Sequence, residues 1–364
     1  MQFRNMLDEI VNGREMTTQE ALLALTDTDP AHRHAAFHAA NMVNEELNRN
    51  VVTWVHNRNV NFTNVCENRC AFCAYYSHED GEEPFLLEPA QVVQRLAETP
   101  GITEVCMTGG LNPSVTLDRL IALVRAVREA FPAIHVHAFS PMELHYYSKR
   151  AGRSLADAVE ALVDAGWGSM CGTAAEILDD VVREEICPDK ISTAEWRTIV
   201  EIVHSHDVMS SATILFGHVE KPAHVVGHLA ILRDIQKTTR GFTEFIPLPF
   251  MPFNTDLGRE RGIRQRVSKE DCFRLYAVSR LYFAETIRNI QVSWVKLGLE
   301  AAVESLGLGV NDMGGTLFEE NITRLAGGTA GQYLSAEQIA SAIRRAGRIP
   351  RQRTTLYELL PERR

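Results

Sequence analysis

The chain has 364 residues, of which 45% are hydrophobic and 23% charged, and these proportions are ordinary for a globular protein of one or two domains. Its formal net charge of −10 argues against a general nucleic-acid binder, because such proteins need a basic surface to displace counterions. No run of 18 apolar residues occurs, so no membrane span is expected. Residues 1–14 lack an apolar signal core and the chain has only seven cysteines, which favours a cytoplasmic protein over a secreted, disulfide-bonded one.

The first 48 residues are predicted to be helical, with Thr18 as an N-cap before Glu20 and Ala21. Strand-like and helix-like segments then alternate along the rest of the chain. The expected strands are 60–65, 102–107, 134–139, 167–172, 209–216, 243–248, 290–293 and 310–312. The expected helices are 92–98, 117–127, 155–164, 194–204, 224–236, 269–285, 296–306 and 334–346.

This alternation amounts to nearly eight βα units and predicts an α/β protein whose strands close into a (β/α)8 TIM-like barrel. We expect an N-terminal helical extension at residues 1–48, and a barrel with a C-terminal helix and tail at residues 49–364. An open doubly wound sheet is the structural alternative. Because active sites of such barrels lie at the carboxyl ends of the strands, polar motifs that follow the strands are the functional candidates.

The most informative of these motifs is a run of three cysteines, Cys66, Cys70 and Cys73, directly after the first barrel strand. Three thiolates in the spacing CxxxCxxC can hold three corners of a 4Fe–4S cluster and leave one iron open to a small molecule. Zinc is the alternative, with His78 as a fourth ligand, and a disulfide is less favoured. The scattered cysteines are expected to be small buried hydrophobic residues: Cys106, Cys171, Cys187 and Cys272.

Two further motifs follow the second and third strands. The paired glycines Gly109 and Gly110 allow the backbone to approach a ligand closely. His135 and His137 are two residues apart on a strand, so both can face the barrel interior. Such a pair can bind metal, but we favour a hydrogen bond from His137 to a substrate or cofactor, with Glu143 orienting one of the histidines.

The segment after the fourth strand carries a carboxylate and a guanidinium. Glu176 can accept hydrogen bonds from a ribose diol or an amine. Arg183 is seven residues further, about two helical turns, so it would lie on a similar face and could pair with a carboxylate. A charge on the surface of a helix is the alternative interpretation of Arg183.

These motifs together resemble the radical S-adenosylmethionine (SAM) superfamily, and within it the branch of deazaflavin and futalosine-pathway enzymes. The pattern is most similar to the second subunit of FO synthase, a family of 5-amino-6-(D-ribitylamino)uracil–L-tyrosine 4-hydroxyphenyl transferases, and is related to aminofutalosine synthase and dehypoxanthine futalosine cyclase. The similarity runs from about residue 40 to Tyr357. Its segments are NFTNVC (61–66), HAFSPME (137–143), GTAAEILDD (172–180), ICP (186–188), GFTEFIPL (241–248) and NDMGGT (311–316).

The resemblance implies a cluster on the three cysteines, SAM on its open iron, and a 5′-deoxyadenosyl radical as oxidant. The glycine pair would bind the methionine amine of SAM. The radical would cleave the Cα–Cβ bond of L-tyrosine, and the 4-hydroxybenzyl fragment would join the ribityl-diaminouracil. An electron donor such as a flavodoxin, ferredoxin or reductase is implied, together with a partner radical SAM protein that closes the deazaflavin ring.

The chain departs from the family pattern at three places close to strand ends: Thr108, Cys171 and the loop 75–80. A diverged radical SAM enzyme acting on another aromatic or amino-acid substrate is therefore the alternative function. A cluster-bearing or zinc-bearing binding protein is the alternative without catalysis.

Overall fold

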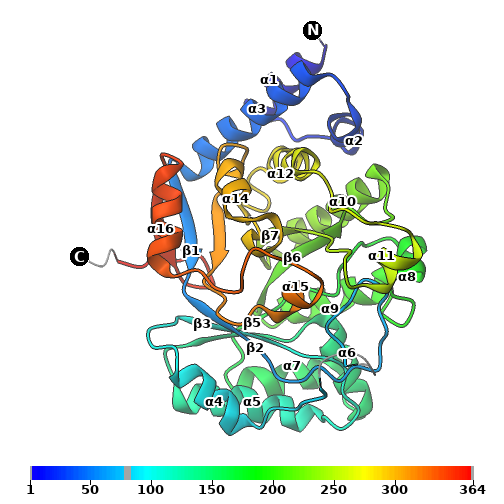
Figure 1. Ribbon diagram of the computed structural model, residues 1–364, viewed down its shortest axis with the longest axis vertical. Coiled ribbons are helices and arrows are strands. Elements are labelled where there is room, and N and C mark those ends of the chain that lie inside the picture. Colours follow the sequence, from blue (N-terminus) through cyan, green and yellow to red (C-terminus); the bar gives the residue numbers. More distant parts are fainter. Residues whose placement is uncertain (1, 78–82, 362–364) are drawn as a thin grey trace.

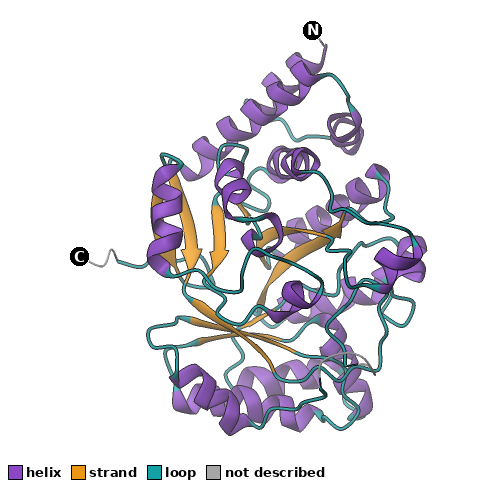
Figure 2. Ribbon diagram, viewed as in Figure 1, coloured by secondary structure: helices purple, strands orange, loops and turns teal. Residues whose placement is uncertain are grey.

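The computed structural model describes residues 2–77 and 83–361 and shows a curved parallel sheet wrapped by helices (Figure 1; Figure 2). The seven strands of this sheet lie side by side in chain order, and every neighbouring pair is parallel. They are β2 (Asn57–Asn61), β3 (Glu104–Thr108), β4 (His135–Ala138), β5 (Ser169–Met170), β6 (Met209–Phe216), β7 (Phe242–Pro249) and β8 (Asn289–Ile290).

Helices α1 to α3 lie at one end of the molecule, at the top of Figure 1, and α3 packs against α12. The remaining helices connect the strands. The helices are α1 (Gln2–Val11), α2 (Thr18–Thr26), α3 (Pro30–Asn48), α4 (Pro89–Ala97), α5 (Leu117–Ala130), α6 (Pro141–Arg150), α7 (Leu155–Asp164), α8 (Asp180–Ile186), α9 (Thr193–Ser205), α10 (Pro222–Thr239), α11 (Asp256–Glu260), α12 (Lys269–Phe283), α13 (Trp294–Leu297), α14 (Leu299–Ser305), α15 (Asn321–Leu325) and α16 (Ala336–Arg345).

A second, three-stranded parallel sheet completes the barrel. Its order is β10 (Ile349–Arg353), β1 (Val51–Val55), β9 (Asp312–Gly315). A bridge between Gln291 and Asp312 joins β9 to the β8 side, and beyond β9 the Asn59 amide donates to the Leu317 carbonyl at 2.8 Å. Because β9 thus lies between β8 and β2, it takes the eighth position, and the predicted (β/α)8 architecture is confirmed.

Several predicted boundaries need correction. Strands β1 and β10 and helix α6 were not expected. Only one residue separates β1 from β2, so no turn signal marks the break between them. Strand β10 contains a proline and two arginines, which are unusual in a strand. The expected helix 296–306 is divided at Gly298, whose φ of +92° interrupts it. The predicted division of the chain at residue 48 stays a prediction.

The predicted N-cap Thr18 is wrong by one position. Thr17 caps α2: its hydroxyl accepts from the Glu20 amide at 3.2 Å, and the Glu20 carboxylate accepts from the Thr17 amide at 2.9 Å. Such a reciprocal capping box requires the acidic residue three positions after the cap, which is why Thr17 is used. Among the described residues, no helix is both long and apolar enough to cross a bilayer.

Side-chain alternation along the strands decides which residues face the lumen. In β4, Val136 and Ala138 are fully buried, whereas His135 and His137 point to the other face and are partly accessible. In β3, Val105 and Met107 are likewise fully buried, and Cys106 lines the internal cavity. In these two strands the apolar side chains therefore pack in the core, and the polar ones supply the interior site.

A buried ion pair ties the three strands of the smaller sheet together. The Arg353 guanidinium donates to both carboxylate oxygens of Asp312, at 2.6 and 3.1 Å. The same carboxylate accepts from the Thr53 hydroxyl at 2.6 Å and from the Gly314 amide at 2.7 Å. Asp312 and Arg353 are both buried, so each charge depends on the other for compensation.

Asp312→Asn keeps the shape of the side chain but removes its charge, which leaves the Arg353 guanidinium buried without a counter-ion. We expect the free energy of unfolding to fall by about 3–5 kcal/mol. Urea denaturation of the anaerobically purified protein, followed by circular dichroism, measures the change. Glu304→Gln is the matched control, because it breaks an exposed pair with Lys269 at a cost below about 1 kcal/mol. Equal stability of the two variants would contradict this role of Asp312.

Candidate active site

A cavity of about 430 Å³ occupies the barrel interior and opens at the carboxyl ends of the strands. Seven of the eight residues for which the sequence favours cluster ligation or a direct contact with a cofactor or substrate line it: Cys66, Cys70, Cys73, Gly109, Gly110, His137 and Glu176. These residues come from segments far apart in the chain, and the barrel brings them to one cavity. Arg183, the eighth, does not line it.

The cysteine loop is held in place by backbone hydrogen bonds to three other segments. The Glu67 amide donates to the Leu111 carbonyl at 3.0 Å, and the Ala71 amide donates to the Ile186 carbonyl at 2.9 Å. The Ala71 carbonyl accepts from the Leu257 amide at 2.7 Å. The loop conformation is therefore fixed by the barrel rather than by the loop sequence alone.

The three cysteines suit a cluster better than a single ion. Their sulfur atoms do not all lie within 4.8 Å of one another, whereas two thiolates on one tetrahedral zinc ion would be about 3.8 Å apart. Burial raises the pKa of the Cys70 and Cys73 thiols, and the nearby Lys190 ammonium acts in the opposite direction. The other proposed zinc ligand, His78, lies outside the described residues.

The glycine pair fits closely against the cysteine loop. A Cβ atom on Gly110 would lie 2.3 Å from the Val65 carbonyl oxygen, and one on Gly109 would lie 2.7 Å from the Phe62 ring. Glu143, buried at the start of α6, accepts from the Gly109 amide at 2.9 Å. Glycine is therefore required at both positions by close packing, and the predicted role of Glu143 in orienting a histidine is wrong, because its carboxylate binds Gly109 and Ser140 instead.

Glu176 faces the cavity in a buried ion pair. The Lys190 ammonium lies 2.5 Å from a carboxylate oxygen of Glu176, and only 13% of each side chain is exposed. This carboxylate and the thiols of Cys70 and Cys187 raise the pKa of Lys190, so the lysine is cationic. Lys190 also lies 5.1 Å from the centre of the Phe72 ring, inside the cysteine loop. A buried ion pair is thus built in next to the three cysteines.

Arg183 stabilises the loop that carries Glu176 rather than facing the cavity. Its guanidinium donates to the carbonyl of Ala175 at 2.7 Å and also to those of Ala174, Ile177 and Ile191. Ala174 and Glu176 have φ angles of +65° and +44°, which are unfavourable for residues with a Cβ atom and persist only when their surroundings impose them. The geometry does not support the predicted contact of Arg183 with a ligand carboxylate.

Lys296 is a second lysine of the cavity, and no sequence pattern marks it. It follows β8 in the short helix α13, and burial lowers its pKa. The charged groups that act on it are Glu320, Glu176 and Cys73, so it lies at the cysteine end of the cavity. A single lysine in a connecting segment has no spacing signal, which explains why neither Lys190 nor Lys296 was identified.

His137 and His135 share one hydrogen-bond partner. The Ser169 hydroxyl lies 2.7 Å from Nδ1 of His137 and 2.8 Å from Nε2 of His135. Burial lowers the pKa of His137 to about 4, so its imidazole is neutral at pH 7. With Nδ1 engaged by Ser169, Nε2 is the nitrogen of His137 that remains for a ligand in the cavity.

Solved structures of similar fold cover nearly the whole chain. The structure of methylornithine synthase superposes with a TM-score of 0.73 at 17% identity, covering 95% of this chain and 97% of that one. The FeFe-hydrogenase maturase HydG from Carboxydothermus hydrogenoformans superposes with a TM-score of 0.76 at 16% identity, covering 98% and 80%. At such low identity the comparison supports the fold alone.

Similarity in sequence is more specific. Residues 60–232 match the radical SAM superfamily, and residues 239–364 match the CofH/MqnC C-terminal region. A protein of Methanopyrus kandleri named 5-amino-6-(D-ribitylamino)uracil–L-tyrosine 4-hydroxyphenyl transferase is 43% identical over 97% of this chain and 96% of its own length. A protein of the same name from Methanocaldococcus jannaschii is 41% identical over 95% of this chain and 98% of its own length. Another, from Methanothermobacter thermautotrophicus, is 42% identical over 94% of this chain and 94% of its own length. Identity at this level along the full length of both partners means that the chain belongs to the radical SAM superfamily, in the family of these 4-hydroxyphenyl transferases.

Proposed function

We propose that this chain is a radical SAM transferase that moves the 4-hydroxybenzyl group of L-tyrosine onto 5-amino-6-(D-ribitylamino)uracil, in the biosynthesis of the deazaflavin FO. The observation that carries the proposal is the near full-length identity with relatives whose names state both substrates. The interior cavity supports it, because three cysteines line it together with both apolar side chains and several buried polar ones.

Cys66, Cys70 and Cys73 would hold a 4Fe–4S cluster, and SAM would bind beside it. When bound, this pair supplies a 5′-deoxyadenosyl radical that abstracts hydrogen from the substrate. The donor set fits the cluster: three thiols on one cavity wall, with Lys190 beside Cys70 to offset their negative charge. Reduction requires an external electron donor, for which a flavodoxin or ferredoxin is the expected class.

Residues at the cysteine end of the cavity are positioned for the polar groups of SAM. Gly109 and Gly110 line the cavity and pack too closely against neighbouring segments to carry side chains, so their backbone atoms are what they can offer to the methionine amine. Glu176 can accept from the ribose or the amine, and Lys296 takes the role of carboxylate partner that the sequence had assigned to Arg183. Arg183 acts indirectly by fixing the loop of Glu176.

The substrates would lie deeper in the lumen, where the lining is polar. Asn57, Glu104, Glu244 and Arg353 all face the cavity there and offer partners for a polyhydroxylated ribityl chain. His137 presents a neutral imidazole to the same space and is the candidate catalytic contact. In the reaction, tyrosine would give one hydrogen atom to the adenosyl radical, its Cα–Cβ bond would break, and the two-carbon remainder would leave as 2-iminoacetate, which hydrolyses to glyoxylate. A C–C bond would form to C5 of the uracil, and the resulting adduct would give up one electron, which would return to the cluster, and one proton. A partner radical SAM protein would then close the deazaflavin ring.

A second candidate function keeps the radical chemistry and changes the substrate. Two of the departures from the family pattern, Thr108 and Cys171, line the cavity, and the third is the loop 75–80, of which residues 78–80 lie outside the described part of the chain. Selectivity in such an enzyme depends on cavity shape and hydrogen bonds, because an adenosyl radical does not itself choose a substrate. Another aromatic or amino-acid substrate is therefore the alternative.

Replacing Cys70 with serine tests the cluster. We expect Cys70→Ser to lose most of the iron of the anaerobically reconstituted protein and all reductive cleavage of SAM, because serine cannot replace a thiolate ligand here. Iron analysis, absorbance near roughly 400 nm and chromatography of 5′-deoxyadenosine measure the outcome. Cys272→Ser is the control, since Cys272 is buried in α12 and does not line the cavity. Normal iron content and SAM cleavage in Cys70→Ser would refute the assignment.

Lys296→Met tests the carboxylate partner of SAM. Loss of a charged contact costs about 1.5–3 kcal/mol, so the dissociation constant for SAM should rise about 10- to 100-fold. Equilibrium dialysis with labelled SAM under anaerobic conditions measures it, on preparations of equal iron content. Lys269→Met is the matched control, because the same substitution removes an exposed lysine on α12. An unchanged dissociation constant in Lys296→Met would exclude this contact.

A product assay decides between the two candidate functions. With SAM, reductant, L-tyrosine and the ribityl-diaminouracil, we expect tyrosine to be consumed in step with the uracil and glyoxylate to accumulate, as measured by mass spectrometry. Omitting either substrate should abolish the coupled product. If 5′-deoxyadenosine forms but the two substrates add nothing above background, the tyrosine transferase proposal fails and the diverged enzyme becomes the better account.

A further inference from the structure

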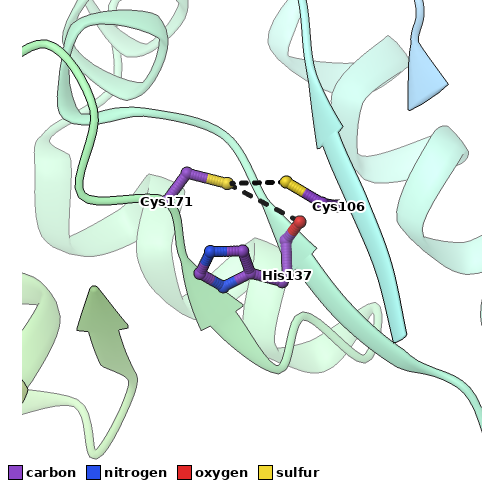
Figure 3. A group of neighbouring side chains, drawn as sticks. All are labelled: Cys106, His137 and Cys171. Carbon is purple, nitrogen blue, oxygen red and sulfur yellow. Dashed lines mark hydrogen bonds between the residues drawn. The ribbon is translucent and has the colours of Figure 1, made fainter. Parts of the chain in front are cut away.

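Cys106, His137 and Cys171 converge in the barrel lumen (Figure 3). Cys106 and His137 are register partners on β3 and β4, and Cys171 follows β5 directly. The ligand atoms of all three lie within 4.8 Å of one another, and all three residues line the cavity. No other group of this kind is found among the described residues.

We propose that Cys106, His137 and Cys171 form a zinc site that is separate from the cluster and presents an open coordination position to the lumen. Two thiolates bound to one tetrahedral zinc ion at about 2.3 Å would be about 3.8 Å apart. The Sγ atoms of Cys106 and Cys171 are 3.9 Å apart. The sulfur pair is therefore already spaced for one ion.

The histidine is oriented as a ligand as well. Its Nδ1 is engaged by the Ser169 hydroxyl at 2.7 Å, which leaves Nε2 for a metal. A hydrogen bond at the second ring nitrogen is the usual way in which proteins fix the tautomer and orientation of a metal-binding histidine. In Figure 3 one edge of the His137 ring faces the two sulfur atoms.

A disulfide between the two cysteines does not fit the fold. The strand β4 lies between β3 and β5, so two strand spacings of about 4.8 Å separate the backbones of Cys106 and Cys171. Disulfides require Cα atoms within about 7 Å.

The donor atoms also favour zinc over a hard cation, because two sulfurs and one imidazole nitrogen suit a borderline-soft ion.

Three protein ligands leave one position of a tetrahedral zinc ion for a small molecule, as in catalytic rather than structural zinc sites. In this cavity that ligand would be an oxygen or nitrogen atom of the bound substrate, and His137 would act on the substrate through the metal. The zinc site would act in the same way whether tyrosine or another molecule is the substrate. As a zinc ligand, Cys171, which departs from the family pattern, would have a direct chemical role.

Zinc binding to the reconstituted holoenzyme tests the proposal. The protein, with its cluster in place, is loaded with one equivalent of zinc sulfate under anaerobic conditions and desalted. We expect about one zinc per chain to be retained, with the iron content unchanged. X-ray absorption at the zinc edge, which the iron of the cluster does not obscure, should show two sulfur neighbours at about 2.3 Å and nitrogen at about 2.0 Å.

Variants locate the site. In Cys106→Ser and Cys171→Ser, zinc affinity measured by competition with a chromogenic chelator should fall more than about 100-fold. Cys272→Ser, the matched control outside the cavity, should retain zinc like the unmodified chain. The proposal is overturned if the holoenzyme retains no zinc, if its zinc has only oxygen and nitrogen neighbours, if zinc uptake occurs only with loss of iron, or if Cys106→Ser and Cys171→Ser bind zinc as tightly as the control.

Discussion

Every strand of a parallel barrel directs alternate side chains into the lumen and outward against the helices, and the chemistry of this protein depends on that constraint. In β3 and β4 the outward positions are apolar and fully buried, for example Val105 and Val136. The inward positions are Cys106 and His137, which line the cavity. A shift of one residue in either strand would place thiol and imidazole among the helices and valine in the site.

Charges in the lumen must be compensated, because the surroundings exclude most of the water that would otherwise solvate them. At the cysteine end, Lys190 is paired with Glu176 at 2.5 Å, and this pair lies beside the thiol of Cys70. At the other end, Arg353 is paired with Asp312. Burial raises the pKa of Glu244 to about 7, although the same Arg353 guanidinium acts in the opposite direction. The cavity thus holds lysines that face carboxylates near the cysteines, and an arginine that faces carboxyl groups at the other end.

The sequence predicts local features better than distant ones. The cysteine spacing and the glycine pair are signals within a few residues, and the periodicity of the strands and helices predicts the barrel. The interpretation of Arg183 failed because it assumed a continuous helix from Glu176, whereas α8 begins at Asp180 and Glu176 has a φ of +44°. Nothing within the local sequence indicates that the guanidinium turns back onto the carbonyls of its own loop.

Contacts between separate βα units could not be predicted from the sequence either. The convergence of Cys106 and Cys171, 65 residues apart, follows only from the order and register of three strands. Thr108 lies on the same side of the lumen, at the end of β3, where the side-chain amide of Asn61 donates to its hydroxyl at 3.3 Å. Thr108 and Cys171, two of the three departures from the family pattern, therefore belong to the wall built by β3, β4 and β5, whereas Tyr75 and Tyr76 of the third line the cavity directly after the cysteine loop. The cysteine loop and its cations lie on other segments, so divergence in this wall changes what the lumen holds without altering the residues that would generate the radical.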